Sequence, residues 1–286
     1  MNAVRIVTDS AAELSEEEAL RLSVRVLPLR YSVGSKIYRE NVDISSDRLL
    51  ELIGQGNTSV TVLPPATEDI VALIEEIARA GDVALIVHVA KGLVPLSQPI
   101  QTVAQDFLGR ARIEVIDSLA VSLGLQCIVR EAARAAAGGA SLAEITQLVR
   151  GMISRVYTVF YTEDFEYLEK SADIQPAQAI LAGILRVRPL VALEEGRPLP
   201  LEKVTPRSTP VDKLAEFVSE FASVDEVAVL VGKEEPELDL QALQDRISQE
   251  FPHLDVGIRQ YGPLVASSVG PRATGVFVRE GQGLAW

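Results

Sequence analysis

At 286 residues, with 48% hydrophobic and 23% charged residues, the chain has a globular composition and a length that suits two domains. A formal net charge of −13 and the lack of any basic cluster argue against nucleic acid as a partner and against attraction to anionic membranes. The single cysteine excludes an internal disulfide, and without an N-terminal signal h-region or an apolar run of ~20 residues we expect a cytoplasmic protein with no integral membrane segment.

The first half of the chain alternates short apolar runs with helical patterns. The apolar runs predict strands at Val4–Val7, Val24–Val33, Val60–Val62, Val83–Val89 and Ile113–Ile116. Helices are predicted at Ser15–Leu22, Asp47–Ile53, Glu68–Ala80, Gln98–Leu108, Ala120–Ala137 and Ser141–Met152. Continuous apolar strands separated by helices are typical of a parallel sheet covered on both faces. The sequence therefore predicts an N-terminal three-layer α/β/α domain with a mainly parallel sheet, over residues 1–160.

The second half has a different pattern, which predicts a smaller C-terminal α+β domain over residues 161–286. A strand at Arg155–Tyr161 precedes it. A β-hairpin turns at Glu194–Gly196, between apolar runs. The remaining predicted strands are Glu226–Val231, Val256–Arg259 and Gly275–Val278, and the predicted helices are Phe165–Glu169, Pro176–Leu185, Val211–Phe221 and Leu240–Phe251.

Two strands of the first domain end on Asp-Ser. Asp9-Ser10 follows the first apolar run, and Asp117-Ser118 follows the run at Ile113–Ile116. Ligands of parallel sheets bind at the carboxyl ends of strands, so this rim, with the segments after Val62 and Val89, is where we expect a site. Asp9 and Asp117 are candidates for paired acid–base carboxylates. Helix capping is the more common role at such junctions, and we favour it.

Other chemical signals are weak. His88 lies inside an apolar strand, where a histidine with satisfied hydrogen bonds is the default, and His253 follows Pro252 in an expected surface turn. Neither histidine has neighbours at metal-ligand spacing, and no P-loop, dinucleotide-binding or serine-hydrolase motif is present. We expect no metal and no cofactor.

A series of segments along the chain forms a recognisable pattern. It begins with Thr8-Asp9-Ser10 and continues with "VRVLPLRYSVGSKIYRENVDIS", "SVTVLPPATEDI", "LSQPIQTV" and "VIDSLAVSLG". The later segments are "FEYLEKSADI", "GILRVRPLVALEEG" and "SSVGPRATGV". In this order they resemble the DegV family of bacterial fatty-acid-binding proteins. The resemblance covers essentially the whole chain, and it rests on the series rather than on any one motif.

The resemblance implies the family's two-domain fold, the EDD fold, with a long-chain fatty acid as ligand between the domains. It implies that the hydroxyls of Thr61 and Ser97 hydrogen-bond the carboxylate, and that the protein is a non-enzymatic lipid-binding carrier. An anion at Ser97 would also meet the N-terminus of a helix, which favours negative charge. Candidates for lining the acyl chain are Phe165, Leu168, Ile180, Ile184 and Leu185, the last three of which are equally an ordinary core stripe.

The chain departs from the family pattern at several charged positions. Asp173 replaces a usual arginine, Ser268 a usual histidine and Arg272 a usual glycine. Some family members present their fatty acid to a separate fatty acid kinase subunit, and these departures weaken that partner more than they weaken acyl binding. Arg186, Arg188 and Arg272 are candidates to supply the missing positive charge.

Two other readings stay open. One is an enzyme that acts on a small carboxylated or phosphorylated substrate with Asp9 or Asp117 as acid or base. The other is a structural or regulatory protein whose lipid slot has closed, because slot-lining and core leucines look alike in a sequence. Acyl chain length and oligomeric state are not encoded in any pattern that we recognise.

Overall fold

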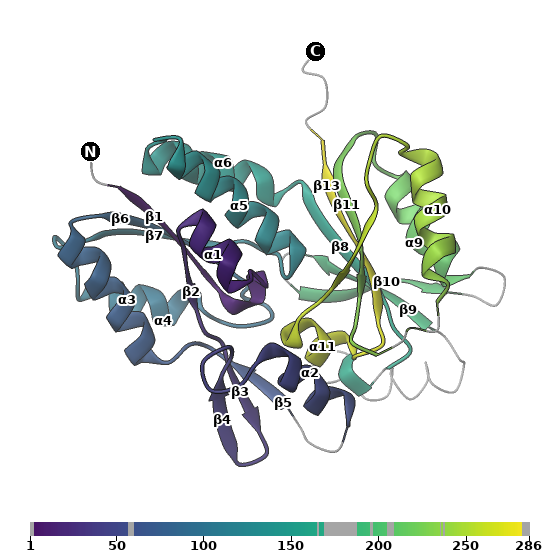
Figure 1. Cartoon of the computed structure of the whole chain (residues 1–286), viewed down its shortest axis with the longest axis horizontal. Coiled ribbons are helices and arrows are strands. Elements are labelled where there is room, and N and C mark those ends of the chain that lie inside the picture. Colours follow the sequence, from purple (N-terminus) through teal and green to yellow (C-terminus); the bar gives the residue numbers. More distant parts are fainter. Residues whose placement is uncertain are drawn as a thin grey trace. The chain divides into compact units, whose positions relative to one another are not determined.

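The computed structural model describes residues 3–56, 60–164, 166–168, 188–194, 197–204, 209–234, 236 and 238–281. The chain divides into two compact units (Figure 1). The first comprises Met1–Arg48 and Thr58–Ser154, and the second Leu49–Asn57 and Arg155–Trp286. The sequence places the boundary at residue 160. In the structure β8 (Val156–Tyr161) pairs with strands of the second unit, so the boundary falls before this strand.

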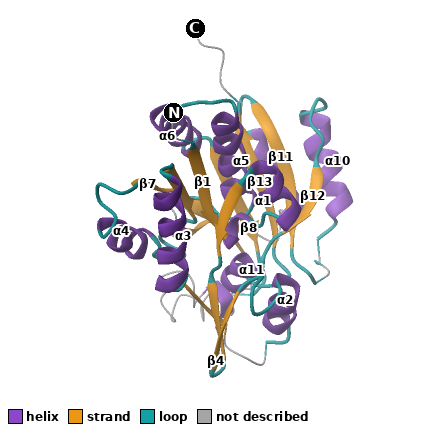
Figure 2. Cartoon of the chain, turned by 60° about the vertical axis from the view of Figure 1, so that its left-hand side comes forward, coloured by secondary structure: helices purple, strands orange, loops and turns teal. Residues whose placement is uncertain are grey.

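The first unit is built on a four-stranded parallel sheet with the order β2-β1-β6-β7. Its strands are β1 (Val4–Asp9), β2 (Val24–Leu27), β6 (Val83–His88) and β7 (Arg112–Asp117). Strand β6 is apolar from Val83 to Val87 because helices cover both faces of the sheet. Helices α5 (Leu123–Ala137) and α6 (Leu142–Ile153) lie on one side, and α3 (Thr67–Ala80) and α4 (Ser97–Gln105) on the other (Figures 1 and 2). The predicted α/β/α arrangement with a parallel sheet is confirmed.

The helices of the first half lie close to their predicted ranges. Two of these helices begin with capping boxes, Ser15 with Glu18 and Ser141 with Glu144, in which the serine side chain accepts from the backbone N–H three residues on. The helices are α1 (Glu16–Leu22), α2 (Ser46–Gly54), α3 (Thr67–Ala80), α4 (Ser97–Gln105), α5 (Leu123–Ala137) and α6 (Leu142–Ile153), with a short 3-10 helix, η1 (Ser10–Ala12), after β1.

A small antiparallel sheet was not predicted. It consists of β3 (Arg30–Val33), β4 (Lys36–Arg39) and β5 (Val60–Leu63) in the order β4-β3-β5. The predicted strand over 24–33 is thus two strands, separated at Pro28, which has no N–H to donate to a ladder. A two-residue turn beginning at Gly34, with φ of 60°, then returns the chain into β4.

The second unit has a six-stranded sheet with the order β10-β9-β8-β13-β11-β12, in which only β11 and β12 pair in parallel. Its further strands are β9 (Arg188–Glu194), β10 (Arg197–Val204), β11 (Val224–Val231), β12 (Gly257–Gln260) and β13 (Thr274–Glu280). The helices are α9 (Pro210–Ser219), α10 (Leu240–Glu250) and α11 (Pro263–Val269). The β9–β10 hairpin is confirmed, whereas α11 was not predicted. Among the helices of the described ranges, none is long and apolar enough to cross a bilayer.

The second unit has one close backbone approach that depends on glycine. Gly232 follows β11 and packs against the turn at residues 270–273, which the hydroxyl of Tyr261 holds by donating to the carbonyls of Gly270 and Ala273. A Cβ at position 232 would overlap the carbonyl oxygen of Pro271 and lie 2.7 Å from the Tyr261 hydroxyl. Either the turn or β11 would have to move to admit a methyl group.

We therefore expect Gly232→Ala to lower the free energy of unfolding by about 1–3 kcal/mol, as overpacking does elsewhere. Gly151→Ala is the matched control, because Gly151 lies in α6 and a Cβ there meets no atom within 4 Å beyond its own helix. That change should stabilise the protein by about 0.5–1 kcal/mol. Urea denaturation of both variants measures the difference, and equal stability of Gly232→Ala and the unsubstituted protein would contradict the packing argument.

Candidate functional site

The carboxyl ends of three parallel strands meet at one edge of the first unit. Strands β1, β6 and β7 end on Asp9, His88 and Asp117. His88 and Asp117 are direct partners in the β6–β7 ladder. In open α/β sheets this edge is where ligands bind, because the loops that leave it are free to shape a site.

Asp9 is a buried structural carboxylate. Its Oδ1 accepts a hydrogen bond from the N–H of Ala11 at 3.0 Å, and its Oδ2 accepts one from the N–H of Val89 at 2.7 Å. The side chain has no exposed surface, and it caps η1, which confirms the capping role. Burial raises the pKa of Asp9 to about 7, while the two backbone N–H groups pull that pKa in the opposite direction.

Asp117 also binds backbone, but it does not cap a helix. Its Oδ1 accepts from the N–H groups of Leu119 at 3.0 Å and Lys91 at 3.2 Å, and its Oδ2 lies 4.0 Å from the Lys91 ammonium. Helix α5 begins only at Leu123, after a loop in which Leu119 and Ser122 have φ of 52° and 53°. The prediction of a helix cap at Asp117 is therefore wrong, since the loop continues past it.

The loops that follow the two Asp-Ser pairs are joined to each other. Ser122 donates its N–H to the carbonyl of Ala11 at 3.0 Å and its hydroxyl to Glu13 at 2.6 Å. The Gln126 amide donates to the carbonyls of Ala12 and Glu13, each at 3.1 Å. These bonds fix the segment after β1 against the start of α5, so the repeated Asp-Ser ends serve to build the edge.

A chain of hydrogen bonds connects Asp9 to the predicted ligand residue Ser97. Asp9 holds the N–H of Val89, and the carbonyl oxygen of Val89 lies 2.6 Å from Nδ1 of His88. Nε2 of His88 lies 2.7 Å from Oγ of Ser97. His88 is fully buried with both ring nitrogens bonded, as expected of a histidine inside this strand. Burial lowers the pKa of His88, against opposing effects of the Val89 carbonyl and Asp117.

Ser97 is the first residue of α4 rather than its cap. The N-cap position is Leu96, whose side chain offers no hydrogen bond, and the Ser97 hydroxyl contacts His88 instead of a backbone N–H of its own helix. In the first turn of α4 Pro99 has no N–H, and the N–H of Leu96 donates to the carbonyl of Val94. The N–H groups of Ser97 and Gln98 have no acceptor among the described residues, so they are the donors that this helix end can offer. No sequence pattern indicated the Ser97–His88 contact, apart from the predicted position of both residues at one sheet edge.

Thr61 lies on the strand predicted at Val60–Val62, which is β5 in the structure. It is an exposed residue in the middle of β5, opposite Ser32 of β3, and so belongs to the small antiparallel sheet rather than to the rim of the parallel sheet. No hydrogen bond between Thr61 and Ser97 occurs in the part of the chain that the structure describes. Both residues belong to the first unit.

Of the residues predicted to line an acyl chain, only Leu168 can be placed. It is fully buried in the helical residues 166–168 of the second unit. The other four, Phe165, Ile180, Ile184 and Leu185, lie outside the described residues.

The positions that depart from the family pattern have local roles. The Ser268 hydroxyl donates to the carbonyl of Leu264 within α11, at 2.9 Å. Arg272 forms an ion pair with Asp164 at 3.0 Å. Asp173 and Arg186 lie outside the described residues, as does the side chain of Arg188 at the start of β9.

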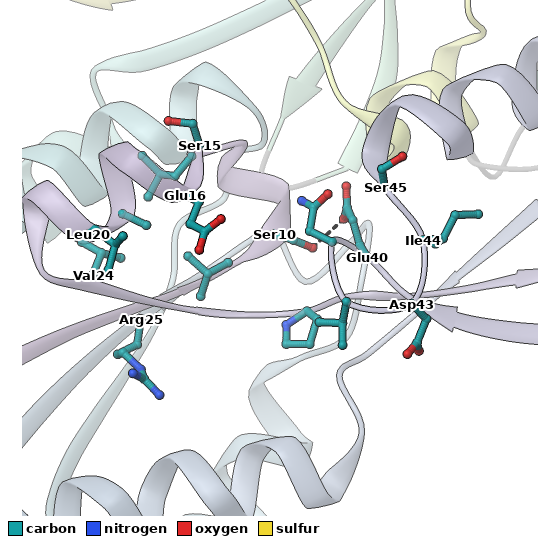
Figure 3. Close-up of a pocket in the computed structure, with 16 residues that line it drawn as sticks. Ser10, Ser15, Glu16, Leu20, Val24, Arg25, Glu40, Asp43, Ile44 and Ser45 are labelled. Atoms are coloured by element: carbon teal, nitrogen blue, oxygen red, sulfur yellow. Dashed lines mark hydrogen bonds between the residues drawn. The ribbon is translucent and has the colours of Figure 1, made fainter.

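A separate groove of about 890 Å³ opens beside η1 and α1 in the first unit (Figure 3). Ser10 and Glu40 face each other on its floor, where Glu40 accepts from the hydroxyls of Ser10 at 2.5 Å and Ser46 at 2.8 Å. Burial raises the pKa of Glu40. Glu16 and Asp43 also line the groove, and Arg25 points away from its floor in Figure 3. This acidic lining does not suit the carboxylate of a fatty acid. Within the described ranges no three His, Cys, Asp or Glu side chains gather as a metal site would require.

The fold is mixed α/β, and the carboxyl-terminal edge of its parallel sheet gathers the side chains of Asp9, His88, Asp117 and Ser97. A family model described as "Uncharacterised protein, DegV family" matches residues 3–281. The chain belongs to the DegV family, as its motifs indicated.

Relatives of this family are similar over nearly their whole length. A DegV domain-containing protein of Halalkalibacterium halodurans is 27% identical over 96% of this chain and 98% of its own. The crystal structure of a fatty acid binding DegV family protein from Streptococcus agalactiae has a TM-score of 0.86 at 20% identity, and covers 99% of this chain and 100% of its own. A stearic acid-binding protein from Eubacterium ventriosum has a TM-score of 0.79 at 17% identity, with 98% and 99% covered.

The raised pKa of Asp9 predicts a pH-dependent contribution to stability. The folded protein keeps the Asp9 proton up to about pH 7, whereas the unfolded chain releases it near the ordinary pKa of 3.8. The contribution of Asp9 is therefore complete below pH 4 and is lost as the pH rises to about 7. The free energy of unfolding, measured relative to that of Asp9→Asn, should fall by about 1.4 kcal/mol per pH unit in this window.

Urea unfolding of both proteins between pH 4.5 and 8 tests this expectation. Asparagine has one carbonyl oxygen, so its side chain can accept from only one of the two N–H groups. The unpaired N–H lowers the free energy of unfolding of Asp9→Asn by about 1–3 kcal/mol at every pH. A stability difference that is constant across the whole range would show that Asp9 is ionised in the folded protein even at low pH.

Proposed function

We propose that this protein binds one long-chain fatty acid and holds its carboxylate at the N-terminus of α4. The observation that carries the proposal is the position of Ser97, the first residue of α4 and part of the edge at which the parallel strands end. The unpaired N–H groups and the positive end of the helix dipole attract an anion there. Thr61 enters the proposal as the second donor because the family resemblance implies it, and its side chain is exposed on β5.

Neutral donors suit a fatty acid in this chain. The protein carries a net charge of −13, and yet a single buried carboxylate needs only enough hydrogen bonds to replace its water. Burial of the acyl chain supplies the affinity, at ~0.8 kcal/mol per methylene and roughly 10 kcal/mol for sixteen carbons before ordering costs. Buried Leu168 fits a role in that lining, which for Phe165, Ile180, Ile184 and Leu185 is a prediction from the sequence.

Similar proteins support this ligand class. The structures from Streptococcus agalactiae and Eubacterium ventriosum are described as fatty acid binding and stearic acid-binding, and the first shares the fold with a TM-score of 0.86. Their descriptions name no reaction. A non-enzymatic carrier accords with Asp9, whose two oxygens are both held by backbone N–H groups and are closed off from a substrate.

Presentation of the fatty acid to a kinase is the less supported part of the proposal. The serine at the usual histidine position, Ser268, is buried and bonded inside α11, and Arg272 is paired with Asp164. Ser268 has no imidazole to offer a partner, and the guanidinium of Arg272 is held by Asp164. Acyl binding does not require either residue.

Protein purified from a heterologous host should carry fatty acid that an organic extract and gas chromatography can identify. The double variant Thr61→Val, Ser97→Ala should bind palmitate at least tenfold more weakly, because each unpaired carboxylate oxygen costs about 1–3 kcal/mol. Thr102→Val is the matched control, since the Thr102 hydroxyl donates to the Gln98 carbonyl on the exposed side of α4. Empty protein that also fails to bind added palmitate would refute the proposal, and substrate turnover lost in Asp9→Asn would favour the enzyme.

A further inference from the structure

The hydrogen bonds of His88 fix the position of its proton. The carbonyl oxygen of Val89 can only accept, and it lies 2.6 Å from Nδ1, so Nδ1 carries a hydrogen. A neutral imidazole has one N–H, which leaves Nε2 as an acceptor. Nε2 lies 2.7 Å from Oγ of Ser97, so the hydroxyl must donate its only hydrogen to His88.

This arrangement limits what Ser97 can offer a ligand. With its hydrogen directed at His88, the Ser97 oxygen presents only lone pairs. An ionised carboxylate also has only acceptors, so the two groups repel each other. A hydrogen bond between them requires one more proton, either on Nε2 of His88, which frees the serine hydrogen, or on the carboxyl group of the ligand itself. The proton count is the same by either route.

We propose that His88 is a positioning residue that couples the binding of a carboxylate at Ser97 to the uptake of one proton. This inference rests on the proposed function and deepens it, because it states the protonation state in which the head group is held. The complex then contains one negative and one positive charge, or a neutral acid, instead of an isolated anion. Burial of a compensated pair costs far less than burial of a lone charge.

The charges around His88 allow it to change state on binding. Asp117, its partner on β7, favours the imidazolium, and Lys91 in the loop after β6 disfavours it. Asp9, at the end of β1, accepts a hydrogen bond from the N–H of Val89 in the loop after β6. Helix α4, which supplies Ser97, contains no titratable side chain. Burial lowers the pKa of His88 in the empty protein, and a carboxylate held at Ser97 adds the negative charge that raises this pKa again.

Calorimetry with palmitate on the full chain tests the coupling. Titrations at pH 7 in two buffers of different ionisation enthalpy should report about one proton taken up per ligand. The dissociation constant for palmitate should rise up to tenfold per pH unit between pH 6 and 8. An ordinary carboxyl group, with a pKa near 4.3, is already ionised throughout this pH range and would cause no such change. Hexadecanol is the control ligand, since its hydroxyl can donate to Ser97 and should bind without proton uptake.

The variant His88→Gln keeps an amide that can bond Ser97 but cannot titrate. It should bind palmitate with no proton uptake and with an affinity that does not change over the same pH range. Two results would overturn the inference and leave the proposed function standing. One is that palmitate binds to the unsubstituted protein without proton uptake. The other is that the dissociation constant of His88→Gln for palmitate still rises tenfold per pH unit. Failure to bind either ligand would refute the proposed function itself. If His88→Gln does not fold, the comparison of palmitate with hexadecanol on the unsubstituted protein decides.

Discussion

The carboxylate of Asp9 is the constraint on which the rest of the edge depends. One oxygen starts η1 through Ala11, and the other fixes Val89 where β6 ends. Val89 in turn holds His88, and His88 holds Ser97. The first residue of α4 is thus tied to the end of β1 by a series of hydrogen bonds inside a dry sheet edge, where each bond is stronger than it would be in water. Removal of the first member would loosen all the others.

Net charge bears on how the proposed ligand would be recognised. In a chain with a net charge of −13, the proposed carboxylate would be held by local donors that are oriented before it arrives. A serine that donates its proton to a buried histidine is a more conditional donor than a lysine or an arginine. The proposed site would therefore respond to protonation, unlike a site that binds anions through permanent positive charge.

Much of the fold could be predicted from local pattern. Strand β6 is a continuous apolar run from Val83 to Val87 because both of its faces are covered, and the serine–glutamate capping boxes mark where α1 and α6 begin. The short strands β3, β4 and β5 were assigned to the wrong sheet or not predicted. A four-residue strand is too short for its hydrophobic pattern to indicate which strand it pairs with. Helix α11 was missed for a related reason. Its residues are nearly all buried, so it has no polar face to reveal a helical period.

The sequence by itself determined the parallel sheet and the rim at which Asp9, Asp117 and Ser97 lie, because hydrophobic period and strand-to-helix order are local properties of the chain. The family was indicated separately, by a series of motifs that resemble it. Tertiary structure alone decided what those side chains do. It placed the N–H of Val89 on Asp9, left Asp117 in a loop rather than at a helix cap, and set the Ser97 hydroxyl 2.7 Å from the imidazole of His88. Such contacts depend on how separate strands and loops meet in space, and a hydrogen bond between residues distant in sequence has no signature in either residue alone.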